Sequence, residues 1–318
     1  MHRTGVPGAA TATPAIVAIG TLAGAAILAS ALLLAPALPA LQTLQTPQAP
    51  AADAVAQGDA AWNRRADGHV AGSGRAPAAA IGEAIAAYQR AQKEQPERLE
   101  VCWKLLRAMH YKGEYVVASK DDRQAVFGAA REVAEAGIER LSRRAGGRER
   151  FDAMTPAAAA KALAGVPEAA PIHLWAGIHW ALWGDNFGRL AAARQGVGDR
   201  VRRYCEVVIA LDERYGDAGG HRLLGRLHTL APKVPFITGW IDRDKAVSEL
   251  RRAYALAPEY PLNAVFLADA LLQYQPAKAA QARRMLHDVL DVAPAPDRVV
   301  EDEDAQKQAR QLLAKNPG

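Results

Sequence analysis

The sequence predicts an all-α protein, and three observations support this prediction. The chain of 318 residues is rich in alanine, which favours helices and allows them to pack closely, while aromatic residues make up only 6% of it. No long segment alternates valine, isoleucine or threonine with polar residues, so strands have little support. A repeated spacing of alanine, bulky residues and proline indicates that the helices form an irregular array of hairpins.

The first element is an uncharged N-terminal segment, which we interpret as an export signal or a membrane anchor at 1–41. Arg3 is the last charged residue before Asp53, and the apolar part at 15–41 is longer than a usual signal-peptide core of about 7–15 residues. It is also long enough for the roughly 20 residues that span a bilayer. A cleaved signal and an uncleaved anchor in the inner membrane are both open. We expect a linker at 42–57 and an exported, periplasmic helical domain at 58–314.

Three segments of the helical domain share one spacing. In each, an alanine, two further apolar residues and a proline follow one another at gaps of 4, 3 and 5 residues. The members are Ala84, Tyr88, Ala91 and Pro96, then Ala246, Leu250, Ala253 and Pro258, and then Ala282, Leu286, Val289 and Pro294. This spacing is typical of the second helix of a tetratricopeptide repeat, which the proline ends because it lacks an N–H and clashes with the preceding turn.

The middle of the chain fits the repeats less well. We predict helices at 99–110 and 126–141, joined by a long connection, and a loop with one short helix at 143–168. The proline-containing segment at 232–244 is predicted to separate the two helices of one repeat. Insertions of this kind often lie on the binding face of a repeat array.

The segment "HRLLGRLH" matches the first helix of a tetratricopeptide repeat, with two histidines in place of the usual aromatic residues. His221 and His228 are therefore predicted to pack inside a hairpin, and Gly225 to lie where two helices touch. A metal site is the alternative interpretation of the two histidines. It has little support, because a third ligand and a His-Glu-x-x-His pattern are both missing from the sequence.

A ligand-binding groove is expected beside these packing positions. Arg222 and Arg226 lie four residues apart on the predicted helix, and Trp180 projects toward the same groove in both registers that we considered for the preceding helix. Trp183 is a further candidate, although packing in the core is the simpler interpretation for this aromatic cluster. Trp240, on the inserted segment, is expected to cap the groove.

Charge and cysteine content limit the classes of function. The net charge is +5, with an arginine-rich stretch at 189–226, so an anionic ligand is conceivable, whereas a solvated helical surface is the simpler interpretation. Aromatic-basic nucleic-acid motifs are missing from the sequence, and we expect no nucleic-acid partner. Cys102 and Cys205 fit small buried residues, and their spacing does not require a disulfide.

The combination of these segments resembles the T-component family associated with tripartite ATP-independent periplasmic (TRAP) transporters. The resemblance covers residues 58–314 and is strongest at 171–272, through "LWAGIHWALWG" and "GGHRLLGRLHTLAPKVPFITGW". It implies a periplasmic protein that works beside a solute-binding protein as a homo-trimer enclosing a ligand-holding cavity. The chain departs from the family in having no cysteine near the end of its apolar segment, which argues against a lipid anchor and leaves 15–41 as the only expected membrane contact.

Two other classes of function stay open. A cell-envelope scaffold would bind a peptide or protein in the groove, as tetratricopeptide arrays commonly do. An enzyme is less well supported, because the sequence contains no Gly-x-Ser-x-Gly, phosphate-binding loop or paired acid–base motif. We therefore expect a protein without catalytic residues, metal or cofactor that binds a small organic ligand.

Overall fold

The computed structural model describes residues 53–317 with the exception of Phe236. Within this range the protein is all-helical and has no strand, which confirms the predicted fold class. The predicted export segment at 1–41 and the linker up to residue 52 lie outside the described residues. None of the helices in the described part of the chain is long and apolar enough to cross a membrane.

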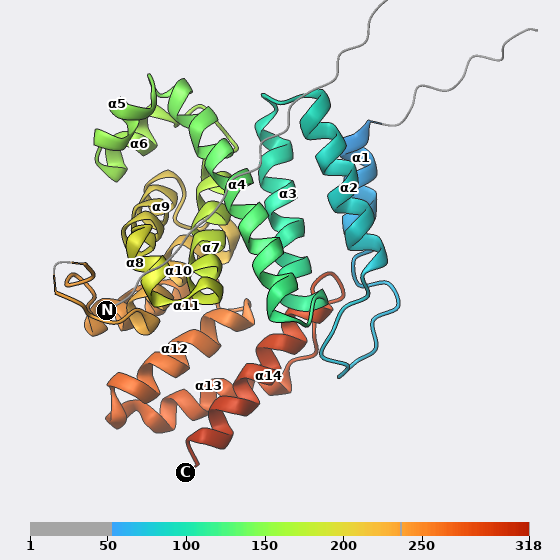
Figure 1. Cartoon of the computed structure of the whole chain (residues 1–318). Helices are drawn as coiled ribbons and strands as arrows, with labels where there is room; N and C mark the ends of the chain where they lie inside the picture. Colours follow the sequence, from blue (N-terminus) through green and yellow to red (C-terminus); the bar gives the residue numbers. More distant parts are fainter. Residues whose placement is uncertain (1–52, 236, 318) are drawn as a thin grey trace, which may run out of the picture. The chain divides into compact units, whose positions relative to one another are not determined.

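Most of the described chain lies in α-helices joined by short connections (Figure 1). In chain order they are α1 (Ala54–Asn63), α2 (Ala79–Glu94), α3 (Leu99–Tyr111), α4 (Lys120–Arg144), α5 (Arg148–Ala153), α6 (Pro156–Ala162), α7 (Ala169–Phe187), α8 (Arg189–Arg194), α9 (Val197–Leu211), α10 (Tyr215–Leu230), α11 (Arg243–Leu256), α12 (Pro261–Tyr274), α13 (Ala279–Asp291) and α14 (Val299–Lys315). A π-helical turn, Lys112–Val116, follows α3, and a 3-10 turn, Pro276–Lys278, precedes α13.

The longer helices pack as successive hairpins. The pairs are α1 with α2, α3 with α4, α7 with α9, α10 with α11, and α12 with α13, and each pair packs on the next (Figure 1). The first helices of the later hairpins, α3, α7, α10 and α12, also contact one another in succession, and together with the last helix, α14, they form a continuous inner row. The short helices α5, α6 and α8 are insertions around α7 and α9.

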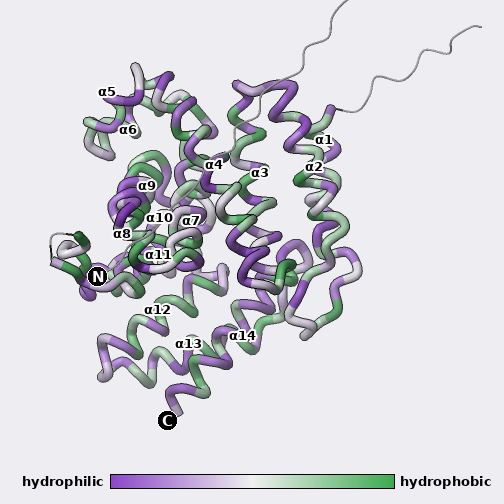
Figure 2. Tube along the Cα trace, in the orientation of Figure 1, coloured by the Kyte–Doolittle hydropathy of each residue, from purple (hydrophilic) through white to green (hydrophobic). Residues whose placement is uncertain are grey.

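The repeated spacing in the sequence corresponds to the buried side of the second helices. The alanines and bulky residues of all three segments are buried, on α2, α11 and α13, and each helix ends two or three residues before its proline. Figure 2 shows hydrophilic and hydrophobic segments alternating along the helices, as expected for helices that bury one side. The hairpin prediction for these segments is therefore confirmed.

Gly225 lies at a close contact between α10 and α11. A Cβ atom at this position would lie 2.6 Å from Leu250 Cγ and 3.1 Å from the carbonyl oxygen of Ala246. Only glycine allows the two helices to approach this closely, so the predicted helix contact is confirmed.

The two ends of the array are connected by polar contacts. Arg65, in the loop after α1, forms an ion pair of 2.9 Å with Glu301 of α14. Glu303 lies two residues further along α14, and it accepts hydrogen bonds from His69 Nε2 at 2.9 Å and from the backbone N–H of Gly72 at 3.2 Å. The loop between α1 and α2 is thus held against the last helix of the inner row.

Several predicted boundaries were wrong. The connection after the helix at 99–110 is short, because the chain continues as the π-helical turn and α4 begins at Lys120, where the Ser119 hydroxyl accepts a hydrogen bond from the backbone of Asp122. The region at 143–168 contains two short helices, α5 and α6, where one was expected. The helical domain begins at Ala54, within the expected linker, because the Asp53 carboxylate caps α1.

Candidate ligand-binding site

Trp180 does not face the inner row, contrary to the prediction from the sequence. It is 3% exposed, and its Nε1 donates a hydrogen bond of 2.7 Å to Glu135 Oε1 on α4. Arg131 of α4 and Arg200 of α9 lie over its ring, with guanidinium-to-centroid distances of 5.4 and 4.8 Å. The register of α7 therefore turns Trp180 toward its outer neighbours, whereas Trp175 lies toward α3.

Trp183 and Trp240 are also held in packing contacts. Trp183 is buried and stacks on Phe187, with ring centroids 4.7 Å apart. Trp240 is half-buried and contacts the edge of His228, with ring centroids 5.4 Å apart, and the guanidinium of Arg202 lies 4.2 Å from its ring. We therefore assign neither ring to the candidate site.

Arg222 and Arg226 point to different partners, so they do not converge on one ligand carboxylate as expected. Arg222 donates to the carbonyl oxygens of Gly216 and Asp217, at 3.1 and 2.8 Å, where the backbone adopts left-handed φ values of 60° and 55°. Arg226 forms an ion pair with Asp269 of α12. Arg222 thus stabilises the first turn of α10, and Arg226 stabilises the contact between α10 and α12.

A polar pocket of about 480 Å³ lies beside Arg226, lined by residues of α12 and α14. Its charged pair is already matched, because Asp269 accepts from Arg226 and from the side chain of Gln273. An anion entering this pocket would have to displace Asp269 from Arg226. The pocket is therefore a poor anchor for the predicted anionic ligand.

The two histidines of the "HRLLGRLH" segment are buried, as the packing prediction requires. His221 Nδ1 lies 2.6 Å from Glu249 Oε2, and His228 Nδ1 accepts a hydrogen bond of 3.0 Å from the backbone of Asp242. Within the described residues, no group of three or more side chains has the composition and geometry of a metal site.

A stripe along α3 is the most promising part of the inner row. Nine of the thirteen residues of α3 are buried, and the other four are only half-buried. These four are Glu100, Trp103, Arg107 and His110, which we call the open stripe. Their spacing of 3, 4 and 3 residues places them on one side of the helix. His110 faces α7, because its ring centroid lies 5.3 Å from that of Trp175.

Arg107 is held between two tryptophans. Its guanidinium carbon lies 4.0 Å from the ring centroid of Trp62, at the end of α1, and 5.0 Å from that of Trp103. Burial lowers the pKa of Arg107, Tyr88 and its hydrogen bond act in the opposite direction, and the nearby charge of Arg65 lowers the pKa further. A cation in this position gains from the ring faces on both sides but is partly removed from water.

Aromatic and basic groups from the neighbouring helices approach the same region. Burial raises the pKa of Tyr215, at the start of α10, to about 12, and the charge of Arg107 acts on it in the opposite direction. Burial lowers the pKa of His110 to about 3, and the charges of His179, Arg222 and Arg123 add to this effect. His110 is therefore neutral at pH 7.

We call these side chains the inner site. It consists of Trp62, Trp103, Arg107, His110, Trp175 and Tyr215. Four helices, α1, α3, α7 and α10, contribute to it. It combines aromatic rings with one cation and a neutral imidazole, which suits a ligand that has an apolar body and an anionic end.

No family model matches the sequence, and no curated protein matches it. The properties of the inner site must therefore be inferred from its own geometry.

The sequence analysis did not identify the residues of the inner site. The signal was present in "LEVCWKLLRAMH", where Trp103 and Arg107 lie four residues apart and His110 follows three residues later. Trp62 lies in a different helix, so its contact with Arg107 depends on the packing of α1 against α3.

The thiols, which are the strongest nucleophiles of the sequence, lie in the hydrophobic core. Cys102 and Cys205 are each 1% exposed. Burial raises the pKa of Cys102 to about 12 and raises that of Cys205 as well. Both thiols stay protonated at neutral pH and behave as small packing residues.

Proposed function

We propose that this chain is an exported, tetratricopeptide-like protein that binds a small organic anion at the inner site without transforming it. By its resemblance to the T-component family, it would work beside a solute-binding protein of a TRAP transporter in the periplasm, as a homo-trimer. The observation that carries the proposal is the open stripe of α3, which combines an arginine with aromatic rings on an otherwise buried helix.

The hairpin packing supports the tetratricopeptide-like character. The three repeated segments bury alanine and bulky residues against neighbouring helices, and Gly225 brings α10 and α11 into close contact. Arrays of this kind present the first helices of successive hairpins as one surface. In this protein that surface is the inner row.

The energetics favour an amphipathic anion over a simple ion. Each charge-assisted hydrogen bond to a guanidinium contributes roughly 1.5–3 kcal/mol, and contact with aromatic rings adds about 25 cal/mol per Å² of apolar surface removed from water. Since association itself costs several kcal/mol, a small inorganic ion with no apolar surface would bind weakly.

The experiment is native mass spectrometry of the full chain purified from a bacterial host that exports it. We expect a complex that releases a small organic acid when the protein is denatured. Release of no small molecule, from protein that is folded by circular dichroism, would contradict the ligand-binding proposal. The same spectra give the mass of the assembly and test the trimer.

One observation favours the alternative scaffold function. Several large apolar side chains are exposed near the start of α8 and along the loop between α10 and α11, which suits contact with a partner protein. They are Phe187, Leu190, Leu230, Val234 and Ile237. Co-purification of a stoichiometric protein, with no small molecule, would favour this alternative.

A further inference from the structure

Arg107 is an unusual cation, because its charge has no carboxylate partner among the described residues. Its Nε is buried and finds no hydrogen-bond acceptor there, and its side chain is otherwise hydrogen-bonded to the hydroxyl of Tyr88, which is a neutral group. Buried polar groups normally have partners, and a half-buried arginine between two aromatic rings would be expected to pair with a carboxylate. Its lack of one therefore needs an explanation.

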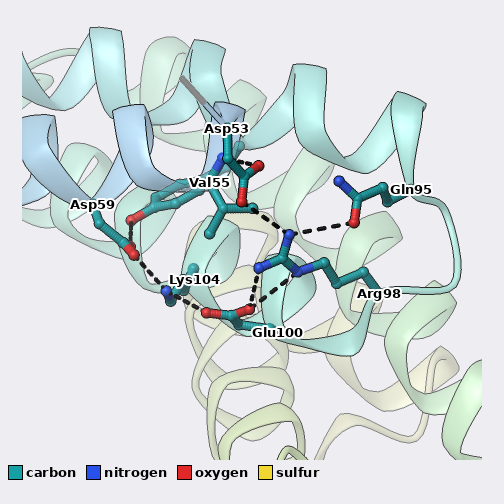
Figure 3. A network of polar contacts seen from close by, with 8 residues as sticks. Asp53, Val55, Asp59, Gln95, Arg98, Glu100 and Lys104 are labelled. Atoms are coloured by element: carbon teal, nitrogen blue, oxygen red, sulfur yellow. Dashed lines mark hydrogen bonds and ion pairs between the residues drawn. The ribbon is translucent and has the colours of Figure 1, made fainter. Parts of the chain in front are cut away.

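The carboxylates of Asp59 and Glu100 are paired with other cations (Figure 3). Asp59 accepts from Lys104 at 2.6 Å and from the Tyr88 hydroxyl at 2.7 Å. Glu100 is held by the same lysine at 2.6 Å and by Arg98 at 2.7 Å. These contacts hold Asp59, in the middle of α1, and Glu100, at the start of α3, on other cations. Neither carboxylate forms an ion pair with Arg107, and Asp59 acts on its charge only from a longer distance.

The second arginine of the region is also paired. Arg65 contacts the ring of Trp62, with 4.4 Å between its guanidinium carbon and the ring centroid, and it forms its ion pair with Glu301. Arg222, across the inner row, donates to backbone carbonyls and to Asn263. Arg107 is therefore the cation of the inner site, and none of the described carboxylates forms an ion pair with it.

We propose that Arg107 binds the carboxylate of an organic monoanion with a flat apolar body, at a site formed with Trp62 and Trp103. This proposal rests on the function proposed above and names its ligand class. The rings cover the two faces of the guanidinium and its Nε is buried, so a carboxylate reaches it along the edge formed by the two Nη groups. The apolar body of the ligand then contacts the rings of Trp175 and Tyr215.

The charge of the site determines which ligands it selects. A single carboxylate neutralises Arg107. A second carboxylate would enter a region in which Arg65 and Arg222 are occupied and His110 is neutral, and burying an unpaired charge is costly. A neutral analogue would leave Arg107 unpaired. The site thus discriminates against both dianions and neutral molecules.

The test is isothermal titration of the full chain with naphthoate, naphthalene dicarboxylate and naphthalene methanol. Naphthoate is expected to bind at least tenfold more tightly than either analogue. Arg107→Gln is expected to weaken naphthoate binding by about tenfold or more, which corresponds to about 1.4 kcal/mol. Arg107→Lys keeps the charge but loses the planar fork, so its loss is expected to be smaller than that of the glutamine variant.

Arg131→Gln is the matched control. Arg131 also lies over a tryptophan pair, Trp180 and Trp183, and also forms no ion pair with a described residue, but it projects from the outer helix α4. The Arg131→Gln variant is expected to bind naphthoate with the same affinity as the parent. Circular dichroism of every variant checks that the helices are intact.

Three results would overturn the proposal. They are naphthoate binding that is equal in the parent and in Arg107→Gln, equal affinity for the mono- and dicarboxylate, and no binding of naphthoate to the parent. The function proposed above has a separate test. Release of a small organic molecule from the purified protein would still support that function, even if the molecule were bound at another site.

Discussion

Replacement of Gly225 by alanine tests the packing of α10 on α11, on which the inner row depends. The new methyl group would lie 2.6 Å from Leu250 Cγ and 3.1 Å from the Ala246 carbonyl oxygen, and neither atom is the mobile end of a side chain. At a separation this far below van der Waals contact, the cost of overpacking lies in the upper part of its usual range of roughly 1–3 kcal/mol, about 2–3 kcal/mol, whereas alanine gains roughly 0.8–1 kcal/mol over glycine in a helix. The expected net loss in the free energy of unfolding is about 1–2 kcal/mol.

Gly128→Ala provides the matched control for this prediction. Gly128 also lies inside a helix, α4, but the nearest atom to an added Cβ is Phe187 Cζ at 3.9 Å, an ordinary contact. This variant is expected to gain up to about 1 kcal/mol from helix propensity alone.

Differential scanning calorimetry of the two variants and the parent measures the difference. For a domain of this size, 1 kcal/mol shifts the melting temperature by roughly 2–4 °C. Gly225→Ala should therefore melt about 2–8 °C below the parent, and Gly128→Ala at or above it. A Gly225→Ala protein that melts with or above the parent would refute the close contact between α10 and α11.

Three further predictions concern the buried histidines, the network at α1 and α3, and export. Burial lowers the pKa of His173 to about 4. Because the unfolded state binds a proton at this histidine from about pH 6.5 downward, the free energy of unfolding falls from there toward about pH 4. His173→Leu should reduce the slope of the free energy of unfolding against pH by up to about 1.4 kcal/mol per pH unit, and an unchanged slope would contradict this. Lys104→Met leaves Asp59 without a cation and Glu100 with Arg98 alone, and it should cost about 1–3 kcal/mol in urea unfolding. Arg143→Met breaks an exposed pair and should cost less than about 1 kcal/mol, and equal effects of the two variants would argue against the network. A reporter enzyme fused after the first 60 residues should be active only outside the cytoplasm, and activity inside it would contradict export.

The parts of the fold that depend on local spacing could be predicted from the sequence. The alanine, bulky residue and proline of each repeat lie within one helix and its end, so their pattern alone indicates a hairpin. Gly225 could be predicted in the same way, from its place between two histidines at a known repeat position. These features require no knowledge of distant contacts.

The direction of Trp180 could not be predicted, because α7 is apolar on nearly all sides. It packs against α3, α4, α9 and α10, and a helix that is buried all round has no polar side to fix its register. The prediction from the sequence therefore placed Trp180 on the wrong side of the helix.

Arg107 was missed for a different physical reason. Arg107 is a candidate because it has no ion-pair partner among the described residues. It lacks one because other cations pair with Asp59 and Glu100. Lys104 contacts Asp59 across 45 positions of the sequence, and Arg65 contacts Glu301 across 236. Only the three-dimensional packing of α1, α3 and α14 shows that Arg107 has no carboxylate partner among the described residues.

A crystal structure of the full chain with bound naphthoate tests the central claim most directly. We predict density for the ligand at the inner site, with its carboxylate within hydrogen-bond distance of the Arg107 guanidinium and its rings against the aromatic side chains of the inner row. Density beside Arg226, in the pocket between α12 and α14, or over Trp180 on the outer side of α7, would contradict the account.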